Sequence, residues 1–309
     1  MNAFSMILVC PLCGESLSEE GGVWRCGRGH SYDAARTGYV NLLPPGKGRN
    51  ARTGDEREMV AARASFLRKG FYDPVDREAA LWLASEGAGG ADPFFLLDMG
   101  AGEGTHTCRV AGLLADVLGT RVTALGFDAS KHAAESGCRY ARSLGYFPKD
   151  GGDTRVRAAV FAGNLFRLPV RDSSAHAALS FFAPIAWEEA GRILRPGGLF
   201  LAASAGREHL IEMRRILYDE VRLTDFLPSP PPEAGFSLIG RKTVSFEAEL
   251  GSREDIGNLF AMTPFYHRTP EAGRERLSAL GSLTVKVETV LSLFRFRGDG
   301  PGPEPESAG

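Results

Sequence analysis

The fold of this chain is decided by the stretch Leu96-Leu97-Asp98-Met99-Gly100-Ala101-Gly102-Glu103-Gly104-Thr105. An apolar run ends in an acid, three glycines follow at alternate positions, and a helical pattern begins near His106. Glycine permits a tight turn and a close approach between backbone and ligand. The stretch therefore predicts a strand, a ligand-binding loop and a helix in succession, as in nucleotide-binding and nucleoside-binding folds.

A second acid lies at a suitable distance from this loop. Asp128 ends the apolar run 122–128, 26 residues after Gly102, where a carboxylate can accept hydrogen bonds from both ribose hydroxyls of a nucleoside. The alternative for Asp128 is an ordinary strand-end cap. The loop reads Asp-x-Gly-x-Gly-x-Gly rather than Gly-x-Gly-x-x-Gly, and in this it resembles the S-adenosylmethionine loop of class I methyltransferases.

The rest of the large block alternates in the same way. Apolar runs at residues 94–98, 122–128, 156–161, 177–182 and 199–203 are separated by amphipathic stretches, which is typical of parallel strands joined by helices. After a predicted helix around 209–221, further strand-like runs at 237–246 and 283–296 flank a short helix near 253–262. We expect an α/β, class I Rossmann-like fold with a mostly parallel seven-stranded sheet and an antiparallel hairpin at its edge. Residues 195–198, Arg-Pro-Gly-Gly, predict a turn before the fifth strand.

The N-terminal residues carry a different chemistry. Their spacing is Cys10-x2-Cys13-x12-Cys26-x3-His30, two ligand pairs joined by a loop. Three thiolates and one imidazole at such spacing fit a tetrahedral zinc site, and four protein ligands leave no open position for catalysis. We therefore expect a structural Zn2+; the alternative is a head with buried, unmetallated cysteines.

Composition bounds the partners. The 309 residues include 36 Lys+Arg and 38 Asp+Glu, and no apolar run reaches the roughly 18 residues of a membrane span, so we expect a cytoplasmic protein without membrane contact. Residues 34–70 nevertheless hold eight basic and three acidic side chains, a local charge of plus five that suffices for binding phosphates. The alternative is a solvated charged helix and loop. We expect Arg49, Arg52 and Arg57 to contact RNA.

Two further positions are open to more than one interpretation. Asn164 follows the run 156–161, so its side chain either faces an adenine at the sheet edge or stabilises a turn. Ser180, Phe181, Phe182 and Pro184 follow the fourth apolar run, where an extruded base could stack on an aromatic face. Since alternate strand residues face opposite sides, we expect one of the two phenylalanines to belong to the core.

Taken together, these motifs resemble the 23S ribosomal RNA (guanine-N1)-methyltransferase family, which includes a tylosin-resistance enzyme. Besides the zinc head and the glycine loop, the resemblance rests on residues 38–44 (Gly-Tyr-Val-Asn-Leu-Leu-Pro), 128–131 (Asp-Ala-Ser-Lys), 183–184 (Ala-Pro), 209–210 (His-Leu) and 262–265 (Met-Thr-Pro-Phe). It covers nearly the whole chain up to about residue 296. From sequence alone His209 would be read as a surface or capping histidine, and only the resemblance moves it to the site.

The resemblance implies a function and a set of residues. It implies methyl transfer from S-adenosylmethionine to N1 of a guanine in a hairpin loop of 23S rRNA near the peptide exit tunnel, by a homodimer. It implies zinc ligands Cys10, Cys13, Cys26 and His30. The side chains and glycines expected around the cofactor are Tyr72, Asp98, Gly100, Gly102, Glu103, Gly104, Thr105, His106, Asp128, Asn164 and His209.

The chain departs from the family at a few places. Residues 183–186 lack the Cys and Lys that some members place after Ala-Pro, Ala101 stands where others have cysteine, and residues 140–154 are longer than expected. We divide the chain into a zinc-binding RNA-recognition head (1–36), a basic linker with a lead-in helix (37–70), a methyltransferase domain (71–297) and a disordered tail (298–309). The rival functions are methylation of another RNA or a small molecule, and RNA binding without catalysis.

Overall fold

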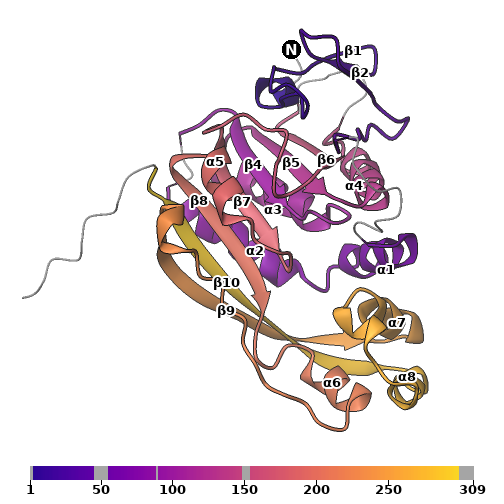
Figure 1. Cartoon of the computed structure of the whole chain (residues 1–309). Helices are drawn as coiled ribbons and strands as arrows, with labels where there is room; N and C mark the ends of the chain where they lie inside the picture. The colour runs from indigo at the N-terminus through magenta and orange to yellow at the C-terminus, as the bar shows by residue number, and fades with distance from the viewer. Residues whose placement is uncertain (1–2, 45–54, 88–89, 148–153, 299–309) are drawn as a thin grey trace, which may run out of the picture.

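The computed structural model describes residues 3–44, 55–87, 90–147 and 154–298. An N-terminal ribbon sits on a central sheet, and a long hairpin extends from that sheet to a cluster of short helices (Figure 1). The α-helices are α1 (Arg57–Arg68), α2 (Asp73–Ser85), α3 (Thr105–Leu118), α4 (Lys131–Ser143), α5 (Trp187–Ile193), α6 (Ile211–Leu217), α7 (Arg253–Ala261) and α8 (Glu271–Ser278). The strands are β1 (Ser18–Glu20), β2 (Val23–Arg25), β3 (Ser31–Asp33), β4 (Phe94–Met99), β5 (Val122–Asp128), β6 (Val156–Ala162), β7 (Ala175–Phe181), β8 (Leu194–Ala205), β9 (Phe236–Leu250) and β10 (Leu283–Phe296).

The large sheet has seven strands in the order β6-β5-β4-β7-β8-β10-β9. The first five are parallel to one another, and β10 is antiparallel to both β8 and β9. The predicted fold class, a mostly parallel sheet with an antiparallel edge pair, is therefore confirmed. Strand order reverses between β4 and β7, and ligands of open α/β sheets bind at the carboxyl ends of strands beside such a reversal.

Both faces of the sheet are covered. All six residues of β4 are buried. Phe94 and Leu96 pack in one hydrophobic cluster with side chains of α2 and α3, whereas Phe95 and Leu97 belong to a second cluster on the opposite face. This burial on both faces explains the nearly continuous apolar runs in the sequence.

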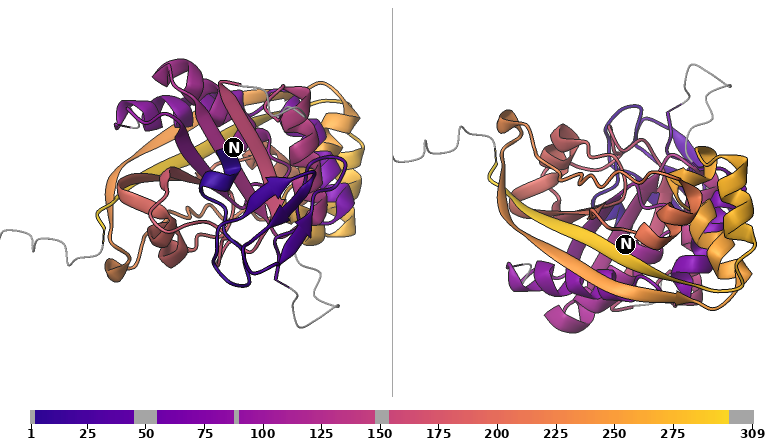
Figure 2. Two further views of the ribbon diagram at one scale, coloured as in Figure 1. Left: turned by 90° about the horizontal axis from the view of Figure 1, so that it is seen from above. Right: turned by 90° about the horizontal axis from the view of Figure 1, so that it is seen from below.

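The N-terminal ribbon supplies part of the second face. The connection from β6 to β7, residues 163–174, contains no helix, although parallel strands are usually joined by one. Its place is taken by Phe4, in the short 3-10 helix η1 (Ala3–Met6), and by Trp24 of β2; their rings pack edge-on against Phe161, with centroids 5.9 and 6.3 Å away. The ribbon therefore shares a hydrophobic core with the sheet, and Figure 2 (left) shows it lying across the parallel strands.

The segment after the ribbon also joins the sheet. The Leu42 N–H donates to the Ala162 carbonyl at 2.8 Å, and the Ala162 N–H donates to the Val40 carbonyl at 3.0 Å, which extends the pairing at the edge of β6. Residues 37–44, predicted as the start of a linker, are thus part of the folded body. Outside the described residues lie residues 45–54 of that linker, with Lys47, Arg49 and Arg52, and the tail from residue 299.

Two local predictions need correction. The helix expected over 209–221 is only α6, because the backbone of Leu210 is left-handed (φ 53°) and that of Tyr218 is already extended. The predicted turn at 195–198 lies inside β8, where Gly197 has φ 79°. None of the described helices has the length and apolar character needed to cross a membrane.

Candidate cofactor site and zinc ribbon

The glycine loop follows β4 at the reversal of strand order. Gly100, Gly102 and Gly104 have φ angles of 87°, 55° and 77°, which favour glycine over any L side chain. A Cβ on Gly100 would lie 2.5 Å from the Cβ of Ala183, and one on Gly104 would lie 2.9 Å from Val160 Cγ2. Both conformation and space therefore require glycine in the loop.

Asp128 ties this loop to the end of β5. Its Oδ2 accepts from the Gly102 N–H at 2.9 Å, and its Oδ1 accepts from the Ser130 N–H at 2.7 Å. Burial raises the pKa of Asp128. Each carboxylate oxygen can accept a second bond, so the carboxylate can still receive the ribose hydroxyls of a nucleoside.

Asp98 lies beneath the loop and is 1% exposed. Its Oδ2 accepts the hydroxyl hydrogen of Thr107, but its Oδ1 is buried without a partner among the described residues. Burial raises the pKa of Asp98 to about 6. A buried unpaired oxygen is costly, and one that lies two residues before the glycine loop fits a site whose remaining donor comes from a ligand.

The first turn of α3 adds further buried polar groups. The Thr105 N–H donates to Glu103 Oε1 at 3.2 Å. His106 Nδ1 lies 2.6 Å from Asp76 Oδ1, and its ring stacks on Phe181 with centroids 4.6 Å apart. Burial opposes a charge on His106, but the Asp76 carboxylate outweighs it and raises the pKa of the imidazole.

Tyr72 and His209 meet beside this group. The Glu288 N–H donates to His209 Nδ1 at 3.2 Å, so Nδ1 must carry a lone pair. In the neutral ring the hydrogen is then on Nε2, which lies 3.2 Å from the Tyr72 hydroxyl oxygen. Burial lowers the pKa of His209 to about 4, which keeps the ring neutral. The hydroxyl hydrogen of Tyr72 is consequently free to donate elsewhere.

Backbone strain gathers at the same place. Three non-glycine residues in the described part of the chain have positive φ, and two of them, Phe182 (54°) and Leu210 (53°), flank this site. The Phe182 ring stacks on His209 and packs edge-on against Tyr72, and the residue is 44% exposed. Phe181 is buried, so the expectation that one of the two phenylalanines belongs to the core is confirmed. Strained backbone of this kind is typical of functional sites.

Helix α1 closes the other side of the loop. Arg63 forms an ion pair with Asp55 and donates to the Met262 carbonyl at 3.4 Å, which connects α1 with residues 262–265. Arg68 bonds to Ser136, and Lys69 forms an ion pair with Asp255. These three basic residues of the predicted patch therefore form bonds within the protein, although the Lys69 side chain remains 44% exposed.

Asn164 differs from the other predicted cofactor residues. Its Oδ1 accepts from the Phe166 N–H at 3.0 Å, and its carbonyl accepts from the Arg167 N–H. The side chain is exposed, and its oxygen is bonded within its own turn, as the second of the two interpretations predicts; the contact with an adenine stays a prediction.

The four predicted metal ligands converge in the ribbon. Their ligand atoms all lie within 4.8 Å of one another. Cys13 Sγ is 3.6 Å from Cys26 Sγ, and His30 Nδ1 is 3.5 Å from Cys10 Sγ and 3.4 Å from Cys26 Sγ. Ligand atoms about 2.0–2.3 Å from one zinc ion in a tetrahedron would have similar separations. The site fits a closed structural zinc centre.

Some residues that contact the metal ligands and the site histidines could not be predicted from the sequence. The Tyr32 hydroxyl lies 3.1 Å from Cys10 Sγ, as an outer partner that orients a metal ligand. Asp76 and Glu288 hold His106 and His209 from distant parts of the chain. Neither residue belongs to a sequence motif, so the local sequence does not predict its role.

Known proteins are similar to this chain both in the zinc ribbon and over most of its length. Residues 8–49 match the family model of the RlmA N-terminal zinc ribbon. A protein of Micromonospora griseorubida, provisionally named a 23S rRNA (guanine-N1)-methyltransferase, is 33% identical over 94% of this chain and 96% of its own. The 23S rRNA (guanine(748)-N1)-methyltransferase of Streptomyces fradiae is 32% identical over 88% of this chain and 90% of its own. The solved structure of the YcgJ protein of Bacillus subtilis aligns with 71% of this chain and 97% of its own at 15% identity, with a TM-score of 0.43.

Proposed function

Because this chain belongs to the family of 23S rRNA (guanine-N1)-methyltransferases, we propose that it transfers a methyl group from S-adenosylmethionine to N1 of a guanine in a hairpin loop of 23S rRNA. The observation that carries the proposal is the meeting of two features at one sheet edge. The glycine loop after β4 offers a nucleoside site, and the exposed ring of Phe182 after β7 offers a face for an extruded base.

The cofactor would be held by the loop and the groups around it. Asp128 has acceptor capacity for the ribose hydroxyls, and the glycines admit the ligand close to the backbone. Tyr72 lies between His106 and His209 beside the loop, and it has a free hydroxyl hydrogen to donate. When bound, S-adenosylmethionine supplies an electrophilic methyl group.

The protein's main task in such a reaction is positioning. Stacking on Phe182 would fix the plane of the target guanine, and the strained backbone holds that ring in place. Reaction at N1 also requires loss of the N1 proton. His209 is poorly suited to accept it, since Nδ1 is occupied by the Glu288 N–H and burial lowers the pKa of the ring to about 4. We therefore assign His209 to positioning Tyr72.

The remaining roles follow from this proposal. The head, residues 1–36, would recognise RNA, and residues 71–297 would bind the cofactor and the target base. We also propose that the enzyme works in the cytoplasm, where ribosomal RNA is made into ribosomes, and that it acts as a homodimer. Light scattering at several protein concentrations tests the dimer directly.

The test of the reaction uses unmethylated 23S RNA and tritiated S-adenosylmethionine. We expect incorporation of label and a reverse-transcription stop at one guanine of the exit-tunnel hairpin. Cofactor binding without incorporation would indicate another RNA or a small-molecule substrate. Loss of both would indicate an RNA-binding protein without catalysis and would overturn the proposal.

A further inference from the structure

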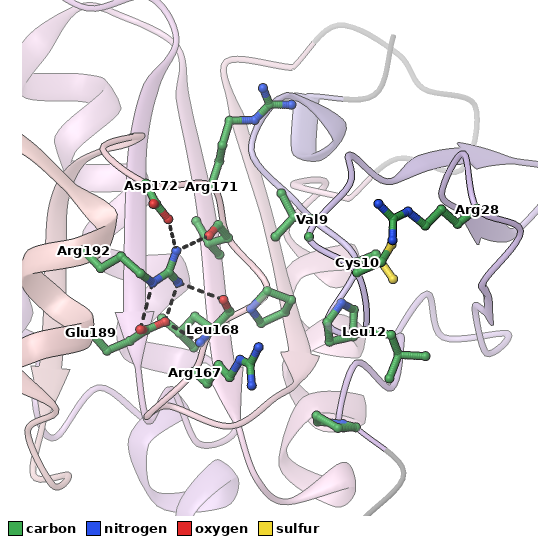
Figure 3. A pocket seen from close by; sticks show the side chains of 16 residues that line it. Val9, Cys10, Leu12, Arg28, Arg167, Leu168, Arg171, Asp172, Glu189 and Arg192 are labelled. Atoms are coloured by element: carbon green, nitrogen blue, oxygen red, sulfur yellow. Dashed lines mark hydrogen bonds and ion pairs between the residues drawn. The ribbon is translucent and has the colours of Figure 1, made fainter.

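A cavity of about 910 Å3 lies between the zinc ribbon and the connection from β6 to β7 (Figure 3). The ribbon contributes residues 9–14 and Arg28 to its lining. The connection contributes residues 167–172, and α5 contributes Glu189 and Arg192. Its size is in the range of ligand sites, yet its position is separate from the glycine loop.

The acidic side chains that line this cavity all pair with one of its arginines. Both lining carboxylates, Asp172 and Glu189, are directed to Arg192, which also donates to the carbonyls of Leu168 and Val170. Figure 3 shows these bonds gathered around Arg192. One arginine therefore neutralises the acids of the lining and has few donors left.

Three other arginines of the lining keep donors available. Arg167 and Arg171 have no carboxylate within 4 Å among the described residues, and Arg171 uses one N–H to hold the Ser16 hydroxyl at 2.7 Å. Arg28 is paired with Glu15, but its side chain remains 66% exposed. A guanidinium carries five N–H donors in a planar fork that matches the oxygens of a phosphate.

The walls that carry these arginines are fixed to each other. Leu8 of the ribbon forms an antiparallel bridge with Val170, and the Val9 N–H donates to the Pro169 carbonyl at 2.9 Å. Arg167 also closes the turn with Asn164, which stands at the carboxyl end of β6 beside the cofactor edge. The ribbon wall and the connection wall of the cavity are therefore held in a fixed arrangement.

We propose that this cavity is a binding site for the phosphate backbone of RNA, in which Arg28, Arg167 and Arg171 contact consecutive phosphates. The inference rests on the proposed function and adds to it the place where the RNA backbone is held. The sequence predicts RNA contacts from Arg49, Arg52 and Arg57. In this proposal the main contact with the RNA phosphates lies at the junction of the ribbon and the sheet instead. Because phosphate contacts carry no base information, the site would accept single-stranded RNA of any sequence.

The test measures binding of a fluorescent oligouridine to the full-length zinc-loaded protein at several salt concentrations. The variant is Arg28→Ala/Arg167→Ala/Arg171→Ala. Three lost phosphate contacts should flatten the log–log salt dependence of affinity by about 2, at roughly 0.7 per contact with a single strand. Zinc content, melting temperature and S-adenosylmethionine affinity should stay at the wild-type values, since the three side chains are exposed.

The matched control replaces three exposed arginines elsewhere on the molecule, Arg77, Arg215 and Arg297, with alanine. We expect it to keep the wild-type salt dependence. If the cavity variant binds oligouridine like the wild type, or if the control loses as much affinity, the inference is overturned. Methylation of 23S RNA is scored separately: a cavity-specific loss of oligouridine binding in a protein that does not methylate 23S RNA would refute the proposed function and leave this site standing.

Discussion

The Nε2 atom of His209 lies 3.2 Å from the hydroxyl oxygen of Tyr72, a residue 137 positions earlier in the chain. The contact of His209 with Glu288 decides which group donates in this bond, because the Glu288 N–H donates to His209 Nδ1. His209 must donate and Tyr72 must accept, which leaves the tyrosine hydroxyl hydrogen free for another acceptor. The contact is therefore an orienting device, and its parts can be removed one at a time.

Two substitutions separate the two nitrogens of His209. In His209→Gln the side-chain amide can reach the position of Nε2, whereas in His209→Asn the amide oxygen can replace only Nδ1. We expect Asn to weaken S-adenosylmethionine binding about tenfold, roughly 1.4 kcal/mol, and Gln to weaken it less. Calorimetric titration measures both affinities. Equal losses in the two variants would contradict an orienting role for the Tyr72 contact.

We expect the charged Asp98 carboxylate to lower the stability of the cofactor-free protein and to strengthen S-adenosylmethionine binding. Burial raises the pKa of its carboxyl to about 6, so the folded state binds a proton more tightly than the unfolded state. The carboxylate therefore costs stability as pH rises from about 4 to 6, and the full cost is present above pH 6. Asp98→Asn should stabilise the cofactor-free protein at pH 8 by on the order of 2 kcal/mol, and not at pH 4.

The same substitution should weaken S-adenosylmethionine binding, because the proposed ligand would supply the donor that Asp98 Oδ1 lacks among the described residues. Thermal unfolding at pH 4 and pH 8 measures the change in stability, and calorimetric titration measures the change in S-adenosylmethionine affinity. Asp225→Asn, at an exposed position, serves as the control that should change neither. A variant that is less stable than the wild type at pH 8 would show that the charge at residue 98 is satisfied in the folded protein.

Gly104 is predicted to be less replaceable than a glycine of similar φ that has open space around it. An alanine there combines a φ of 77° with contacts of 2.9 Å to Val160 Cγ2 and 3.0 Å to Gly137 Cα. Gly119 has a similar φ of 68° but open space around it, so Gly119→Ala isolates the conformational cost, about 1–2 kcal/mol. Denaturant unfolding should give a larger loss for Gly104→Ala, and Val160→Ala should recover part of the difference. Equal losses at both glycines would remove the steric argument.

The zinc ribbon should be coupled to the stability of the whole sheet. From the sequence alone the head is a separable unit, but Phe4 and Trp24 pack on Phe161 of β6. Phe4→Ala should therefore destabilise the entire protein by roughly 3–4 kcal/mol. A zinc chelator should lower the main calorimetric transition as well as release Trp24, which fluorescence can follow. A main transition that stays in place after zinc removal would establish an independent head.

Phe182 should affect the RNA step without affecting the cofactor. Loss of base stacking costs about 1–3 kcal/mol, so Phe182→Leu should lower kcat/KM for RNA by roughly 10-fold to 100-fold. Phe182→Tyr keeps the ring and should retain most activity. S-adenosylmethionine affinity should remain within about twofold in both variants. If Leu and Tyr behave alike, the ring is not the stacking surface.

Local patterns in the sequence determined much of this protein. The strands, the glycine loop with Asp98 and Asp128, and the ligand set from Cys10 to His30 are all visible within short windows. Each depends on periodicity, glycine conformation or ligand spacing, which act between residues close in the chain. Because these local preferences agree with the global fold, the predicted sheet and the convergence of the metal ligands were confirmed.

Only the tertiary structure decided which side chains meet. Phe182 keeps a left-handed backbone and a partly exposed ring, strand β10 brings Glu288 to His209, and Lys69 pairs with Asp255, which lies 186 residues later in the chain. The ribbon packs on the large sheet because the connection from β6 to β7 has no helix and the apolar face of the sheet required a cover. Such choices depend on burial and pairing between distant segments, and no local pattern of residues encodes them.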